Sequence, residues 1–228
     1  MYNKHALLIY DFLYYATMNE TLRMKKLLLM ITLVISSMFA TASEPGLSPY
    51  KVIESAGNKL FARIAREQGT LKTNPDLMQI IVEEELMPSV DYQYASYKIL
   101  GKHLKQTTKE QRDNFTNAMR QYLVKTYANA LTKYKNQQVK YEREQDIKNG
   151  KKIVSVDTVI VETGSPEIKI TFQLRLNEKT QQWKAYDMIV EGISLLSSKQ
   201  AEFAGRLAKD GIDKVALDLL AMSDSSTR

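Results

Sequence analysis

The chain has 228 residues, a formal net charge of +6 and 25% charged residues, and this length is enough for one domain with a sizeable hydrophobic core. It contains no cysteine and two histidines, His5 and His103, which excludes a disulfide framework and zinc sites built from cysteine and histidine. The basic residues are spread along the chain, so nothing in the composition indicates nucleic-acid binding, and we expect no nucleic acid, metal ion or cofactor as a ligand.

The first 42 residues read as a leader that does not belong to the fold. Met24-Lys25-Lys26 is a basic start, Leu27–Phe39 is an apolar run, and Ala40-Thr41-Ala42 is a small-residue cleavage site, so residues 24–42 are predicted to be a secretory signal peptide. A membrane-spanning helix needs about 20 apolar residues, so we expect a mature protein that does not span the membrane. Residues 1–23 are interpreted as an upstream mis-start or an N-terminal extension.

Helical periodicity dominates the first part of the mature chain, after a predicted linker over residues 43–50. One helix is expected to end at Gly69 and a second to begin at Asn74-Pro75 and end at Pro88. The apolar side of that second helix is predicted to carry Leu77, Ile80, Ile81 and Leu86. A third helix is predicted over Tyr92–Leu100.

The clearest helix follows two possible capping boxes, Thr107-x-x-Glu110 and Thr108-x-x-Gln111. Its apolar residues recur on one side at helical spacing. These residues are Phe115, Met119, Tyr122, Leu123, Tyr127, Ala130, Leu131 and Tyr134.

From Gln137 the period changes to two, which predicts four strands joined by short turns. A closing helix capped by Ser197 follows, Gly211 interrupts it, and a last short helix leads to a polar tail over 223–228. The predicted fold class is therefore α+β, with N-terminal helices, an antiparallel four-stranded meander and C-terminal helices in a single domain over 43–222.

Three segments make the chain resemble a known family: Val82–Phe115, Ala118–Leu131 and Trp183–Phe203, the last containing Tyr186-Asp187 and Glu191-Gly192-Ile193-Ser194. They are similar to the MlaC family of toluene-tolerance or auxiliary transport proteins. The resemblance implies a periplasmic carrier in a Gram-negative cell that helps to maintain outer-membrane lipid asymmetry. Its ligand would be a glycerophospholipid. Its partners would be an outer-membrane lipoprotein–porin complex and the inner-membrane MCE-domain subunit of an ABC transporter.

Such a carrier needs an apolar cavity. One wall could be the apolar face of the predicted strands, and the other could be the apolar side of the long helix. Without the resemblance, the same faces would be interpreted first as a packed core. The predicted lipid-binding residues are Met119, Leu123, Tyr127, Val156, Ile160, Ile170, Phe172, Leu174, Met188 and Val190. The predicted rim or partner contacts are Gln173, Gly192, Ile193, Ser194 and Leu196.

An alternative function is a small periplasmic hydrolase or isomerase with a pocket near Ser194 and Asp187. Ser194 stands in Gly-x-Ser-x-Leu and lacks the second glycine of a nucleophile elbow, and His103, in a lysine-rich segment, is expected to be solvated. We therefore predict no catalytic residue. Asp187 is expected to be a structural hydrogen-bond acceptor and Glu191 to be solvated. A second alternative is an interaction module with a filled core.

Overall fold

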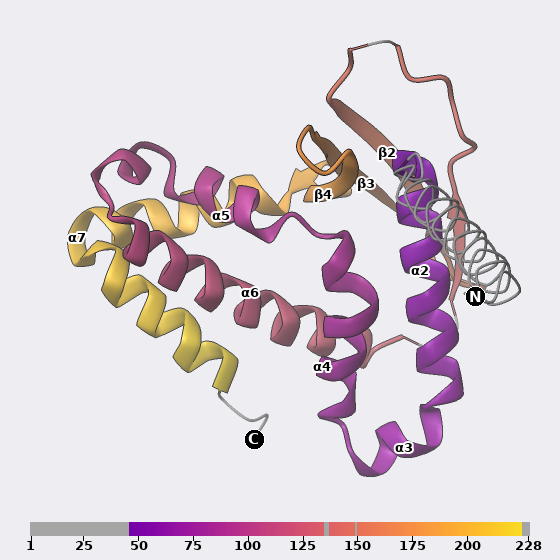
Figure 1. Cartoon of the computed structure of the whole chain (residues 1–228). Coiled ribbons are helices and arrows are strands. Elements are labelled where there is room, and N and C mark those ends of the chain that lie inside the picture. The colour runs from indigo at the N-terminus through magenta and orange to yellow at the C-terminus, as the bar shows by residue number, and fades with distance from the viewer. Residues whose placement is uncertain (1–45, 135–136, 149, 225–228) are drawn as a thin grey trace, which may run out of the picture. The chain divides into compact units, whose positions relative to one another are not determined.

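The computed structural model describes residues 46–134, 137–148 and 150–224, and the predicted leader lies outside these residues. The chain begins with helices α2 (Pro49–Arg66), α3 (Gln68–Thr73) and α4 (Leu77–Ile81), as Figure 1 shows. The predicted linker is too long by two residues, because the Ser48 side chain accepts a hydrogen bond from the Lys51 N–H and caps α2. The prediction that a helix ends at Gly69 is also wrong, since Gly69 lies inside α3.

The segment after α4 is a π-helical turn, η1 (Val82–Leu86), followed by a 3-10 turn, η2 (Met87–Ser89). The sequence predicted one continuous α-helix here. A π-turn changes the number of residues per turn and therefore the face on which each side chain lies. Ile80 is 49% exposed, contrary to the prediction, and Met78 and Val82 are buried instead.

The next two helices form where they were predicted, but the long one ends at Leu131, so Tyr134 lies beyond it, and Ala130 is exposed. Helix α5 (Tyr92–Leu100) ends at Gly101, whose φ of +51° suits glycine, and a 3-10 segment, η3 (Gly101–Gln106), follows. Helix α6 (Lys109–Leu131) has a full capping box in which Thr108 and Gln111 satisfy each other's backbone N–H groups.

The sheet has five antiparallel strands in the order β1-β2-β3-β4-β5, one more than predicted. The strands are β1 (Gln138–Tyr141), β2 (Ile153–Val161), β3 (Ile168–Asn177), β4 (Gln182–Val190) and β5 (Ile193–Ser194). The extra strand, β5, follows a two-residue turn made by Glu191 and Gly192. Both residues have positive φ, 47° and 83°. Positive φ at both positions gives the turn the twist that joins two antiparallel strands in a hairpin. A register shift between Gln173 and Leu174 marks a bulge opposite β4.

Helix α7 (Leu195–Asp224) consists of two arms joined at Gly211, whose φ of 78° and ψ of 167° are not helical. The predicted break at Gly211 is confirmed. The predicted start at Ser197 is wrong, because Ser194 takes the cap position and the helix begins at Leu195. The polar tail was predicted to begin at residue 223, but Ser223 and Asp224 still belong to the helix.

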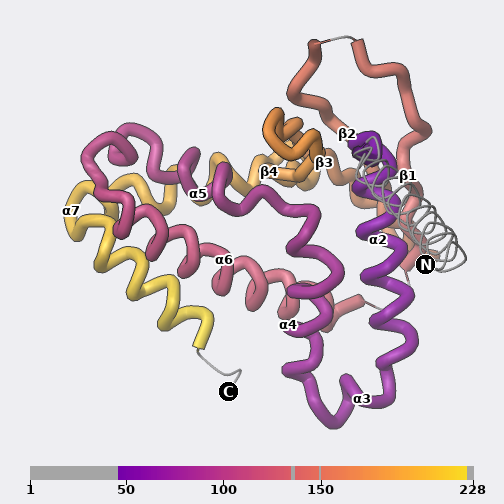
Figure 2. The backbone as a smooth tube through the Cα atoms, viewed as in Figure 1, coloured from indigo at the N-terminus to yellow at the C-terminus, as the bar shows by residue number. Residues whose placement is uncertain are grey.

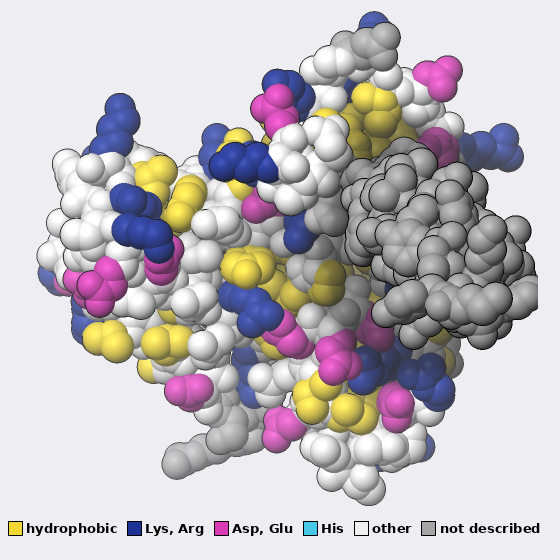
Figure 3. Space-filling model, viewed as in Figure 1, with side chains coloured by type: hydrophobic (Ala, Val, Ile, Leu, Met, Phe, Trp, Pro, Cys, Tyr) yellow, Lys and Arg dark blue, Asp and Glu magenta, His cyan; other side chains and the backbone are white. Residues whose placement is uncertain are grey.

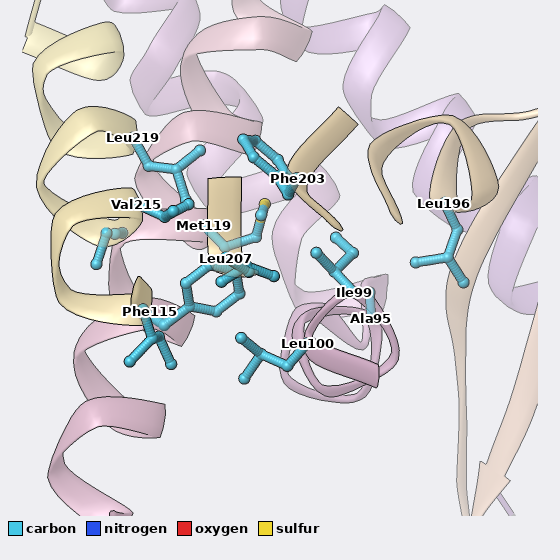
Figure 4. Close-up of a cluster of buried hydrophobic side chains, with 13 residues drawn as sticks. Ala95, Ile99, Leu100, Phe115, Met119, Leu196, Phe203, Leu207, Val215 and Leu219 are labelled. Atoms are coloured by element: carbon cyan, nitrogen blue, oxygen red, sulfur yellow. The ribbon is translucent and has the colours of Figure 1, made fainter. Parts of the chain in front are cut away.

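The buried apolar residues form three clusters. The helical cluster joins α5, α6 and both arms of α7, and Figure 4 shows its side chains pointing toward one another. A second cluster joins α2, α4, η1 and the C-terminal half of α6, and a third joins the start of α2 to β2 and β3. Figure 2 shows α6 running from the α7 kink towards α4, so that its two halves serve different clusters. In the described part of the chain, no helix has the length and apolar character needed to cross a membrane.

Candidate functional site

One face of the sheet carries seven of the ten predicted lipid-binding residues. The register places Val156, Phe172 and Met188 side by side on adjacent strands, and it places Ile170 beside Val190. Side chains two apart in a strand share a face, so one apolar surface contains all seven. They are Val156, Ile160, Ile170, Phe172, Leu174, Met188 and Val190.

This apolar sheet face is covered unevenly. At one end Val154, Val156 and Leu174 are fully buried beneath Tyr50 and Ile53 of α2. Towards the other end, Ile160, Ile170, Phe172, Met188 and Val190 are only half-buried. The edge itself is open, with Ile168 42% and Ile193 63% exposed. The protein's own side chains therefore cover only one half of the face completely.

The three predicted residues on α6 have different surroundings. Met119 is 1% exposed and packs inside the helical cluster. Leu123 is half-buried and packs against both the helical cluster and the second cluster, which joins α2, α4, η1 and α6. Tyr127 is also half-buried. Of these three residues, Leu123 and Tyr127 are the ones that keep accessible surface.

Tyr127 packs against the second cluster, which joins α2, α4, η1 and α6. Desolvation by the surrounding protein, and secondarily the charge of Asp187 on β4, raise the pKa of Tyr127 to about 12. The side chain nevertheless keeps part of its surface accessible.

Ser194 and Asp187 form a helix cap. The Ser194 hydroxyl donates to Asp187 Oδ2 at 2.7 Å and accepts from the Ser197 N–H at 2.9 Å, while Asp187 Oδ1 accepts from the Leu196 N–H at 2.9 Å. Asp187 is therefore a structural acceptor, as predicted. These hydrogen bonds connect the start of α7 to β4. The Ser194 hydroxyl donates its proton to the Asp187 carboxylate, which also accepts hydrogen bonds from backbone N–H groups. This arrangement serves structure and gives no support to the hydrolase alternative.

The predicted rim residues divide between the surface and the interior. Gly192 and Ile193 are exposed at the β4–β5 turn. Gln173 lies on the opposite face of the sheet, where its side chain donates to Ser155. Leu196 was expected at the rim, but it is 9% exposed and packs at the edge of the helical cluster (Figure 4), because the cap turns its side chain inward.

Two expectations about polar residues need correction. Glu191 accepts a hydrogen bond from the Lys169 N–H, so it is exposed but not simply solvated. His103 is half-buried, and its Nε2 has no hydrogen-bond partner among the described residues.

Each carboxylate of the run Glu83-Glu84-Glu85 is paired with an arginine. Arg63 binds Glu84 and Glu85, and Arg120 binds Glu83. Within the described residues no group of acidic or histidine side chains could hold a metal ion. The three glutamates therefore join α2 and α6 to the π-turn.

Sequence reasoning missed a second connection between helices and sheet. Asp91 caps α5, its backbone N–H donates to the Ala185 carbonyl at 2.7 Å, and its carboxylate binds Arg175 at 2.6 Å. Arg175 in turn stacks over Tyr94, which meets Tyr186 edge to face. The only local signal was an aspartate just before a helix, since its partner Arg175 is far along the chain.

Figure 3 shows hydrophobic side chains near the middle of one face of the molecule, with Lys, Arg, Asp and Glu side chains around them. An apolar surface next to charged groups suits an amphipathic ligand, whose apolar part needs shelter while its polar part stays in water.

Comparisons with known proteins agree with this chemistry. The model of the MlaC protein family matches residues 54–221. The chain is 33% identical over 193 residues to the intermembrane phospholipid transport system binding protein MlaC of Haemophilus influenzae, covering 84% of this chain and 90% of that protein. It is 25% identical over 182 residues to the toluene tolerance protein ttg2D of Pseudomonas putida, covering 79% of this chain and 83% of that protein.

A solved structure has the same fold. The phospholipid-binding protein of Ralstonia solanacearum, solved in complex with a phospholipid, superimposes with a TM-score of 0.68 at 20% identity, covering 78% of this chain and 97% of that chain. This likeness confirms the predicted α+β fold class.

Proposed function

The chain belongs to the MlaC family, and from this premise we propose that it is a phospholipid carrier of the periplasm. The lipid's acyl chains lie on the uncovered half of the apolar sheet face, and its head group stays in water at the open edge. The relatives named above are a binding protein of a phospholipid transport system and a phospholipid-binding protein.

The half-covered sheet face is the observation that carries this proposal. A side chain such as Phe172 on a sheet interior is normally fully covered, because leaving apolar area in water costs about 25 cal/mol per Å². Here Ile170, Phe172 and Met188 are only half-buried, although the described domain has two well-packed clusters elsewhere and a third at the α2 end of this same face. A bound hydrocarbon chain would complete the burial that the protein leaves unfinished.

The same energetics explain why a carrier is needed. Burying one CH₂ group is worth roughly 0.8 kcal/mol, so two acyl chains of about 16 carbons represent on the order of 25 kcal/mol. A lipid cannot leave a membrane for water at a useful rate against that cost. Release requires a partner that offers an equally apolar path, so we expect hand-off by direct contact near the open edge at Ile168 and Ile193.

The predicted leader over residues 24–42 would place the carrier in the periplasm. There it would exchange lipid with an outer-membrane lipoprotein–porin complex and with the inner-membrane MCE-domain subunit of an ABC transporter. These two partners are part of the proposal and follow from the family's role.

Lipid extraction provides the direct test. We expect the purified protein to carry a phospholipid, visible by native mass spectrometry and by chromatography of an extract. Phe172→Asp should abolish most of this occupancy, because the new carboxylate would lie unpaired against the acyl chains. Leu123→Asp should have the same effect from the α6 side.

Ile153→Asp is the matched control, because Ile153 pairs with Arg175 on the opposite face of the same sheet and is 46% exposed. It adds the same charge but should leave the lipid in place. Repeated preparations without lipid, and without uptake from vesicles, would refute the proposed function. Equal loss of lipid in Phe172→Asp and Ile153→Asp would refute the assigned face.

A further inference from the structure

A single row of side chains crosses all five strands on the apolar sheet face. Tyr141 of β1 pairs with Thr158, Thr158 with Ile170, Ile170 with Val190, and Val190 with Ile193 of β5. Four interstrand spacings of about 4.8 Å make the row about 19 Å long, a length comparable to that of an extended fatty-acyl chain.

The row runs from an open end to a closed end. Ile193 is 63% exposed, Val190 and Ile170 are half-buried, and Thr158 is buried with its hydroxyl donating to the Ile170 carbonyl at 3.3 Å. The Tyr141 hydroxyl at the far end is buried and finds no hydrogen-bond partner among the described residues. Such an unpaired polar atom normally costs free energy, so its placement needs a reason.

Close contact with α2 holds Tyr141 in this place. A Cβ atom added at Gly57 would lie 2.2 Å from the Tyr141 hydroxyl oxygen and 3.0 Å from the ring carbon that bears it, so only glycine leaves room for the phenol. Burial, and then the charges of Glu54 and Tyr134, raise the pKa of Tyr141 to about 12. Phe61 of α2 stacks on Tyr134 with ring centroids 4.5 Å apart and adds a second connection between α2 and the chain that leads into β1.

We propose that Tyr141, seated against Gly57, closes the inner end of the lipid site and so sets the length of acyl chain that the protein holds. This inference rests on the proposed function, because it assigns a specificity residue to the same sheet face. The phenol acts as a stop through its volume, which explains why its hydroxyl is held against a glycine without a partner.

The test compares chain-length selection in the wild type and in two single variants. Delipidated protein is exposed to phosphatidylglycerol vesicles that contain an equimolar series of acyl-chain lengths, and the bound lipids are identified by native mass spectrometry. Tyr141→Val keeps a strand-forming residue but removes the ring. We expect it to favour longer chains by about fourfold for each additional methylene that the new space holds.

Gly57→Ala is the opposite test, because its methyl group would push the phenol towards the lipid. We expect it to select against the longest chains, and Tyr141→Phe in the same protein should reverse much of that effect, since it removes the oxygen nearest the new methyl group. Tyr122→Leu is the control. It removes a half-buried tyrosine from the helical cluster, where the hydroxyl accepts from Lys199, and it should leave the bound mixture unchanged.

The two proposals fail in different ways. A wild-type protein that takes up no lipid contradicts the carrier function before any variant is compared. A wild-type protein that takes up lipid, with folded variants that bind the same mixture of chain lengths, overturns the role of Tyr141 alone. Circular dichroism checks folding, and Gly57→Ala decides the question if Tyr141→Val does not fold.

Discussion

At the residue scale, Asp187 shows how one side chain can organise the junction of a strand and a helix. Its carboxylate accepts the Leu196 N–H, the Ser194 hydroxyl and the N–H of Met188 next to it. Two of these donors belong to the first residues of α7 or to its cap, where backbone N–H groups have no partner within the helix. Asp187 therefore fixes where α7 starts relative to β4.

Loss of the cap should lower stability while leaving the lipid in place. Ser194→Ala should reduce the free energy of unfolding by about 1 kcal/mol, the usual effect of removing an N-cap. Asp187→Ala should reduce it by about 3 kcal/mol, because it removes charged hydrogen bonds from several donors. The double variant should lose less than the sum, since the two residues share a hydrogen bond.

Urea denaturation measures all three values. Ser198→Ala is the control, because this neighbouring hydroxyl is exposed and only donates to the Ser194 carbonyl, so its change should stay within about 0.5 kcal/mol. A Ser194→Ala protein as stable as Ser198→Ala, but unable to hold lipid, would contradict the structural role of Ser194.

At the scale of the element, α7 depends on one residue to pack both of its arms onto the same helices. Gly211 turns the chain, so that Phe203 and Leu207 before it and Val215 and Leu219 after it all enter the helical cluster. Arg206 of the first arm pairs with Asp218 of the second and holds the corner closed. A straight helix of this length could not contact the cluster twice.

Two glycines in α7 should therefore respond in opposite directions to the same substitution. Gly211→Ala should destabilise the protein by about 1–3 kcal/mol, because its φ and ψ lie in a region that almost only glycine adopts. Gly205→Ala should stabilise it by about 0.5–1 kcal/mol, since Gly205 is helical and a Cβ there would meet nothing within 4 Å. Thermal unfolding of both variants measures the difference, and a stabilised Gly211→Ala would show that the corner is not required.

At the scale of the whole molecule, the buried core of the described residues is divided into three groups. The helical cluster, the α2–α4 cluster and the sheet cluster are separate groups of buried side chains, and Leu123, at the divergence of the first two, is only half-buried. On the apolar sheet face, only the residues at the α2 end belong to a buried cluster. The half-buried residues of this face are not buried members of any of the three clusters. On the proposed function, a hydrocarbon chain bound to the half-covered sheet face would add burial that the protein lacks by itself.

Ligand binding should therefore stabilise the protein measurably. Any ligand that binds only the folded state adds RT ln(1 + [L]/Kd), or about 2.7 kcal/mol at a hundredfold excess over Kd. Delipidated wild-type protein should regain about this much when phospholipid vesicles are restored, as measured by the denaturation midpoint. Folded Phe172→Asp should gain little, and a wild-type protein that binds lipid without any change in midpoint would contradict this account of the core.

Local patterns in the sequence determined much of this protein. Alternation in β3 placed Ile170, Phe172 and Leu174 on one face, because side-chain direction in a strand depends only on parity. The same holds for the capping box at Thr108 and the break at Gly211, which are properties of a few consecutive residues. The family resemblance rested on motifs of the same local kind.

Only the tertiary structure decided which of these faces is covered and how far. Leu174 and Phe172 have the same pattern, yet α2 buries the first completely and leaves the second half open. Met119 was predicted to contact lipid and Leu196 to lie at the rim, but both are buried in the helical cluster. Tyr141 packs against Gly57, which is far away in sequence. Burial depends on the element that packs opposite, and no pattern within a single segment contains that information.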